Sequence, residues 1–304
     1  MDDPRLSRLR LIVGGAALLV LAACGSSAAS PAASPGPAAA TPTFTPAPPA
    51  QSTPQPVIDG TPALVLEPPE FVSSPTPTRI SLTLPQERLI LEAPGPGSQV
   101  VSPVRVAGWG GPSSQGKVFV RLIGEQGQVL ARTTTYLLAQ DGAAGQFVLT
   151  VPFSLSGVAE AGLVEVSING YTTGKLEHIA TRPVVFLSVG PGRVHTNQAV
   201  AEKLTLFSPR ADRAIRGGVI SVSGAAWLDE DLPLLIEVLD RSGAVIASTE
   251  VEVEAPVLGE LGTFQAQVPY SVPFSQYAYV AVTERGLHPP AVRHYTSVRV
   301  YLEP

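Results

Sequence analysis

The stretch GQFVLTVPFS, residues 145–154, decides the fold of this chain because it recurs as GTFQAQVPYS at residues 262–271. Both copies place an aromatic residue two positions after a glycine and close on Val-Pro-aromatic-Ser. Other positions recur at the same spacing of about 115 residues: Pro94 with Pro209, Gly108 with Gly224, Gly127 with Gly243, and Leu187 with Leu302. Such a period is far longer than the units of solenoid or propeller repeats. The sequence therefore predicts a duplicated domain, in which each copy folds around its own core.

Short runs in both copies alternate apolar and polar residues, as strands with one buried face do. In the first copy these runs are residues 89–91, 104–106, 118–122, 147–151, 164–168 and 184–187; in the second they are 220–222, 234–239, 245–247 and 250–254. Turn signals such as Asn169-Gly170 separate them. About seven strands in about 100 residues predict an all-β chain with two tandem immunoglobulin-like β-sandwich domains.

Four features of these copies carry a family resemblance. They are an Ala-Pro or Ser-Pro after the first strand (residues 93–94 and 208–209), a Val-x-Val-x-Gly strand (104–108, with a variant at 220–224), hairpin glycines (Gly127 and Gly243) and the Gly-x-Phe-x-x-x-Val-Pro motif. In these features both repeats resemble the immunoglobulin-like domain associated with bacterial spore germination. The resemblance implies an exported or membrane-attached accessory module of the cell envelope, with a link to sporulation or germination.

The N-terminus has the pattern of an export signal. Residues 1–10 hold three arginines, and residues 11–23 form an apolar run of 13 residues, a length typical of a signal peptide. The run ends in Leu-Ala-Ala-Cys-Gly, which resembles a bacterial lipobox. We therefore predict cleavage between Ala23 and Cys24, a covalent lipid such as palmitate on Cys24, and a protein anchored at the extracytoplasmic face of the cell membrane. An ordinary secretory signal or an uncleaved anchor is the alternative.

Composition then divides the chain. Pro, Ala, Ser and Thr dominate the residues after Cys24, which lack the apolar side chains needed to offset the entropy of ordering. The predicted parts are a lipoprotein signal peptide (1–23), a disordered tether (24–86), a first sandwich (87–189), a linker (190–202) and a second sandwich (203–304).

Charge and cysteine content limit the partners. A net charge of −5 gives no electrostatic reason to expect nucleic acid. Residues 88–188 carry 7 basic and 6 acidic side chains, whereas residues 202–304 carry 8 and 13. Cys24 is the single cysteine, so no intrachain disulfide can form. The expected partners are the membrane, through the lipid, and an envelope protein or glycan.

Two sets of residues are candidates for ligand binding. Asp229, Glu230 and Asp231 form an acidic cluster on a predicted loop, where Ca²⁺ could bind, although a solvated loop is the default interpretation. Trp109 and Trp227 lie beside predicted loops and could contact a glycan or peptide, although core packing is the default for both. The two tryptophans stand one and three residues after their glycines, so we do not expect them to be equivalent.

No catalytic site is predicted. The histidines, His178, His195, His288 and His294, are scattered through predicted turns and linkers without a nucleophile to pair with. We expect no cofactor other than the lipid and a non-catalytic role in binding or scaffolding. The alternatives are a glycan- or peptidoglycan-binding surface module and, less favoured, a hydrolase with an unrecognised site.

Overall fold

A computed structural model describes residues 84–197 and 201–304. The predicted signal peptide, the cleavage site at Ala23 and Cys24, and residues 24–83 of the predicted tether lie outside the described residues. Within the described part of the chain, no helix is both long and apolar enough to cross a membrane.

The first copy folds as two facing sheets. One sheet has three strands in the order β1 (Leu89–Ala93), β3 (Val104–Gly110) and β6 (Gly145–Val151). The other contains β2 (Ser98–Val101), β4 (Lys117–Gly124), β5 (Val129–Tyr136), β7 (Ala159–Asn169) and β8 (Leu176–Leu187). A single 3-10 turn, Ser114–Gly116, precedes β4.

The second copy repeats this plan. Its three-stranded sheet has the order β14 (Leu261–Pro269), β11 (Val219–Trp227) and β9 (Leu204–Ser208). The facing strands are β10 (Ala214–Ile215), β12 (Leu234–Leu239), β13 (Val245–Val251), β15 (Gln276–Leu287) and β16 (Pro290–Leu302). The predicted all-β, immunoglobulin-like architecture is confirmed.

The repeated motif is explained by one packing unit in each copy. Phe147 on β6 lies opposite Gly108 on β3, and Phe264 on β14 lies opposite Gly224 on β11. A Cβ added to Gly108 would lie 2.6 Å from the Phe147 ring, and one on Gly224 would lie 2.4 Å from the Phe264 ring. Each ring therefore uses the space that its glycine leaves, and separate hydrophobic clusters form around the two rings.

The strand register corrects one predicted equivalence. Val100 pairs with Phe186, and Ile215 pairs with Leu302 in the corresponding parallel contact. The counterpart of Leu302 is therefore Phe186 rather than Leu187. Burial agrees, because Phe186 and Leu302 are fully buried whereas Leu187 is only half-buried.

The predicted strand 250–254 is divided between two sheets. β13 ends at Val251 after pairing with β12, and Glu254 then forms an isolated bridge with Thr263 of β14. The alternation was predicted correctly, since the glutamates are exposed and Val251 and Val253 are half-buried. The prediction of one continuous strand was wrong because the chain crosses from one sheet of the sandwich to the other within this run.

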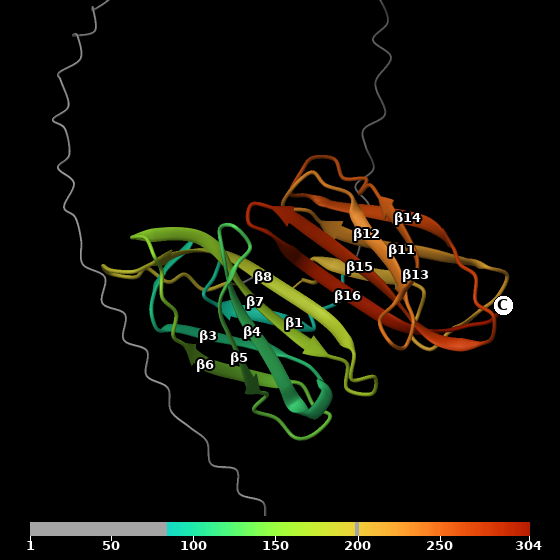
Figure 1. The fold of residues 1–304 in the computed structure, drawn as a ribbon, viewed down its shortest axis with the longest axis horizontal. Helices are drawn as coiled ribbons and strands as arrows, with labels where there is room; N and C mark the ends of the chain where they lie inside the picture. Colours follow the sequence, from blue (N-terminus) through green and yellow to red (C-terminus); the bar gives the residue numbers. More distant parts are fainter. Residues whose placement is uncertain (1–83, 198–200) are drawn as a thin grey trace, which may run out of the picture. The chain divides into compact units, whose positions relative to one another are not determined.

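The two copies are joined by strand pairing. β8 pairs antiparallel with β16 through Ala180 and His294, Ile179 and Tyr295, and His178 and Thr296. Figure 1 shows these two strands side by side. Together they join the larger sheets of both copies into one ten-stranded sheet.

The connection between the copies lies along the first one. The backbone N–H groups of Arg193 and Gln99 each donate to the other's carbonyl at 2.8 Å, and Gly95 donates to the His195 carbonyl at 2.7 Å. The Asn197 N–H donates to the Glu92 carbonyl at 2.7 Å. Residues 193–197 of the predicted linker therefore run as an added edge segment of the first sandwich.

Candidate functional site

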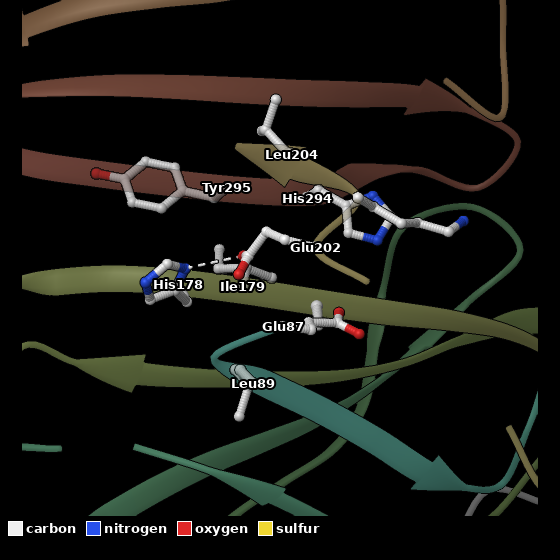
Figure 2. A pocket seen from close by; sticks show the side chains of 10 residues that line it. Glu87, Leu89, His178, Ile179, Glu202, Leu204, His294 and Tyr295 are labelled. Carbon is white, nitrogen blue, oxygen red and sulfur yellow. Dashed lines mark ion pairs between the residues drawn. The ribbon is translucent and has the colours of Figure 1, made fainter. Parts of the chain in front are cut away.

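Buried charge gathers where β8 meets β16, which is unexpected because ionised groups are rarely buried without partners. We call this region the seam; it comprises residues 177–182 of β8, residues 293–297 of β16, Glu87, Glu202, Lys203 and Glu284. Figure 2 shows a pocket within the seam, whose lining side chains come from β1, β8, β9, β16 and the segments that precede β1 and β9. They surround a cavity of about 10 Å³, which is close to the space one water molecule needs.

Glu87 and Arg182 form the most deeply buried pair of the seam. Both are nearly inaccessible, with 3% and 2% exposure, and the Arg182 Nη2 atom lies 3.5 Å from Glu87 Oε2. Arg182 also donates from Nη1 to the Thr181 carbonyl at 2.8 Å. Burial raises the pKa of Glu87 to about 7, and the charge of Glu202 adds to this effect, although Arg182 and Lys203 oppose it. Glu87 therefore titrates close to neutral pH.

The two seam histidines each face a carboxylate. His294 Nδ1 lies 2.6 Å from Glu284 Oε2 across the β15–β16 pair, and both side chains are buried. His178 Nδ1 lies 3.5 Å from Glu202 Oε1, the contact drawn in Figure 2. The Nε2 atoms of both rings are buried and have no hydrogen-bond partner within the described part of the chain.

A larger cleft of about 410 Å³ adjoins the seam, and its basic and acidic side chains pair across it. Lys203 Nζ contacts the Asp229 carboxylate at 3.0 and 3.3 Å, and Arg293 Nη2 contacts Glu230 Oε1 at 2.9 Å. Burial would raise the pKa of Asp229, but Lys203, His294 and Arg293 together lower it below its usual value. The pKa of Glu230 is also lowered, because Arg293 and the Leu287 N–H outweigh burial.

Each buried acidic side chain named above faces a basic one, and these charge pairs suit the seam to hold the two sandwiches in register. The carboxylates of Glu87, Glu230 and Glu284 each contact a basic side chain within 3.5 Å, which offsets part of the cost of removing them from water. The mixture of donors and acceptors in the cleft could contact a small polar ligand. Within residues 84–197 and 201–304, no group of three or more metal-binding side chains is arranged to hold an ion.

The structure separates the three carboxylates of the calcium hypothesis. Asp229 and Glu230 line the cleft beside the seam and face Lys203 and Arg293. Asp231 is exposed and lines a different hollow, next to Val257. Calcium binding here stays a sequence-based prediction, and the geometry brings only two of its three residues together.

The two tryptophans lie on different sheets and are not brought together. Trp109 on β3 pairs with Gln146, whereas Trp227 at the end of β11 pairs with Leu261. Both are half-buried. The backbone N–H of Trp227 donates to the Lys203 carbonyl at 2.9 Å, and Lys203, but not Trp227, is among the residues that line the cleft beside the seam. By register the counterpart of Trp109 is Ala225, which agrees with the expected non-equivalence.

The prediction that all four histidines lie in turns and linkers was wrong for two of them. His178 lies in β8 and His294 in β16, whereas His195 and His288 do lie in connecting segments. Polar residues interrupt the apolar alternation in both strands because their partners are buried charges. Sequence analysis also missed six seam and cleft residues: Glu87, Arg182, Glu202, Lys203, Glu284 and Arg293. An arginine or histidine within a long strand was the available signal.

Comparison with known proteins agrees with this fold. Residues 89–174 match the family described as the immunoglobulin-like domain of bacterial spore germination. The match covers β1 to β7 of the first sandwich, and the predicted resemblance is thereby confirmed for that copy. No curated protein matches the chain. The first sandwich is thus similar to the germination-type domain, which is a non-catalytic type of fold.

Proposed function

We propose that the chain is a non-catalytic lipoprotein of the bacterial cell envelope that presents two immunoglobulin-like domains for binding or scaffolding, with a role connected to sporulation or germination. The family match over residues 89–174 carries this proposal. The second sandwich supports it because it repeats the same strand plan and the same Gly-Phe packing unit.

The proposed location of the protein, at the membrane, rests on its N-terminal sequence pattern. A 13-residue apolar run that ends in Ala23-Cys24-Gly25 is the pattern on which lipid attachment acts. Two or three acyl chains hold a protein on a membrane stably. The proposed arrangement is a lipid on Cys24, a proline-rich tether and the two sandwiches at the extracytoplasmic face.

Metabolic labelling with an alkyne analogue of palmitate tests the proposed lipid attachment and membrane location. The full chain, expressed in a bacterium with lipoprotein maturation, should take up label and remain in the membrane fraction. The matched Cys24→Ala variant should take up no label. An unlabelled wild-type chain would remove the lipoprotein proposal.

A glycan-binding role is the second candidate. The backbone N–H of the half-buried Trp227 donates to the carbonyl of Lys203, and Lys203 lines a cleft that holds charged and amide side chains. Tryptophan is enriched in binding interfaces because its ring is apolar and its indole N–H is polar. Purified peptidoglycan would then retain the wild-type protein and lose a Trp227→Ala variant. Equal retention of both proteins, or of neither, would argue against this role.

A further inference from the structure

Because the two sandwiches are copies of one fold, equivalent edges of them can be compared. In the first sandwich, residues 192–197 follow the edge formed by the end of β1 and by β2. Their contacts include Glu92, Gly95, Ser98, Gln99 and Val101. The equivalents of these five residues in the second sandwich are Phe207, Arg210, Arg213, Ala214 and Arg216. All five line a groove of about 600 Å³ that no described residue occupies.

The matching of residues 92–101 in the first sandwich to residues 207–216 in the second rests on corresponding hydrogen bonds as well as on sequence spacing. Gly97 donates from its N–H to the Pro183 carbonyl at 2.8 Å, and Asp212 donates to the Arg299 carbonyl at 2.7 Å. Gly97 and Asp212 both have positive φ angles, of 73° and 60°. The turns before β2 and β10 therefore have the same shape, and the groove lies where the first sandwich holds its connecting segment.

The groove offers backbone groups to an extended chain. The carbonyls of Arg213 and Ile215 point to β16, where they accept from Tyr301 and Glu303 at 2.9 Å. Successive residues of a strand point their backbone groups to opposite edges. The N–H and C=O of Ala214 therefore point into the groove, as those of Gln99 point to Arg193 in the first sandwich.

The side chains around the groove differ between the copies in charge. Arg210, Arg213 and Arg216 are exposed, and within the described residues only Arg216 forms an ion pair, with Glu303 at 2.7 Å. Phe207 and Val219 on the same groove are 40% and 44% exposed. Three guanidinium groups beside two apolar side chains are unusual on a copy that holds 8 basic and 13 acidic residues.

We propose that this groove binds an extended acidic peptide segment of another protein, which adds alongside β10 as residues 192–197 add alongside β2. Strand addition supplies hydrogen bonds that do not depend on sequence, and the arginines supply selectivity for carboxylates. The occupant cannot be a copy of residues 192–197. Thr196 lies against Gly95, where a Cβ would be 2.9 Å from its carbonyl carbon, and Arg210 replaces that glycine. This proposal rests on the binding role proposed above and specifies its site.

A fluorescent peptide tests the groove in the chain from residue 25 onward. The probe is a fluorescein-labelled synthetic peptide of sequence Glu-Val-Glu-Val-Glu, which is acidic, favours an extended backbone and does not copy residues 192–197. Fluorescence anisotropy at low salt should show saturable binding. The double variant Arg210→Glu/Arg213→Glu should bind at least about ten-fold more weakly, because two attractive charges become repulsive. The matched control is Arg105→Glu, an exposed arginine of the first sandwich outside the groove, which should bind as the wild type does.

The outcomes separate this proposal from its alternatives. No saturation up to about 1 mM protein, or equal binding by the double variant with an unchanged urea midpoint, would overturn it. Equal competition by heparin and by a shuffled peptide would show a general polyanion site and would also overturn it. A chain lacking residues 25–75 that binds at least ten-fold more tightly would identify the chain's own N-terminal segment as the occupant. None of these outcomes would affect palmitate labelling. Failure of the groove proposal can therefore be distinguished from failure of the proposed lipid anchoring.

Discussion

At the scale of the residue, Glu87 couples the seam to pH. Its pKa of about 7 in the folded protein exceeds the ordinary value of 4.5, so the folded state binds the proton more tightly than the unfolded state does. Its contribution to stability is therefore fully present below pH 4.5 and is lost as the pH rises through 7. The shift corresponds to at most about 3 kcal/mol between these limits.

The variant Glu87→Gln tests this dependence. Glutamine keeps an oxygen that can accept from Arg182 but does not titrate, so the free energy of unfolding of the variant should gain on that of the wild type as the pH rises from 5 to 8. Urea unfolding of both proteins at four pH values measures the difference. A difference that stays constant across this range would contradict the raised pKa, whatever its absolute size.

Gly108 gives a second prediction at this scale. An added methyl would lie 2.1 Å from the Ile90 carbonyl oxygen and would also strike the Phe147 ring, so Gly108→Ala must displace both. We expect a loss of at least about 1–3 kcal/mol in the free energy of unfolding. Gly157→Ala is the control, because its nearest neighbour would be 3.9 Å away, and it should change stability by less than about 0.5 kcal/mol. Equal midpoints for both variants in urea would refute the packing unit.

At the scale of the element, strands could be predicted where apolar and polar residues alternate. Where a strand carries buried charges, the predicted strand was shorter than the observed one. Residues 118–122 and 147–151 were located correctly because their inward residues are apolar. β8 was predicted from residue 184 onward, although it begins at Leu176. His178 and Arg182 interrupt its alternation, and their partners are distant in sequence. Arg182 contacts Glu87, 95 residues earlier, and no local pattern contains that information.

The paired strands β4 and β7 carry a charge pair that can be tested. Arg121 donates from Nε and Nη2 to the two carboxylate oxygens of Glu165, both at 2.6 Å, and Glu165 is only 2% exposed. The Arg121 side chain is 43% exposed, so water can partly replace it. Arg121→Met should therefore cost about 1–3 kcal/mol by leaving a buried carboxylate without its partner.

A double-mutant cycle isolates that pair. Adding Glu165→Gln to Arg121→Met removes the unpaired charge, so the double variant should be more stable than the sum of the two single losses implies. Urea midpoints of the four proteins give the coupling energy. Strict additivity would mean that the two side chains do not depend on each other.

At the scale of the whole molecule, duplication and fold class could be read from the sequence, whereas the way the copies join could not. The repeat at residues 145 and 262 marks the two packing units correctly because each depends on contacts within its own copy. The seam depends on pairing between His178 and Thr296 and on charges of both copies. A segment predicted as a linker proved to hydrogen-bond along the first sandwich, because its backbone groups meet a free strand edge.

The join predicts coupled unfolding. Each copy holds one tryptophan, so Trp109→Phe leaves Trp227 as a reporter of the second sandwich and Trp227→Phe leaves Trp109 as a reporter of the first. Since β8 and β16 share a sheet and buried charges, both reporters should give the same urea midpoint, matching that from circular dichroism. Midpoints that differ by more than about 0.5 M would show that the sandwiches unfold separately.

The segment that leads into the first sandwich pairs with the segment that leads into the second, and this pairing has a mechanical consequence. Gln86 bridges to Ala201, and Glu202 accepts from the Arg88 N–H at 3.1 Å while donating to the Pro85 carbonyl at 3.3 Å. These contacts close residues 87–200 into a loop whose two ends meet. A pull between the N-terminal side and a partner held by the second sandwich would pass directly through this junction. The first sandwich would then be spared the tension until the junction gave way.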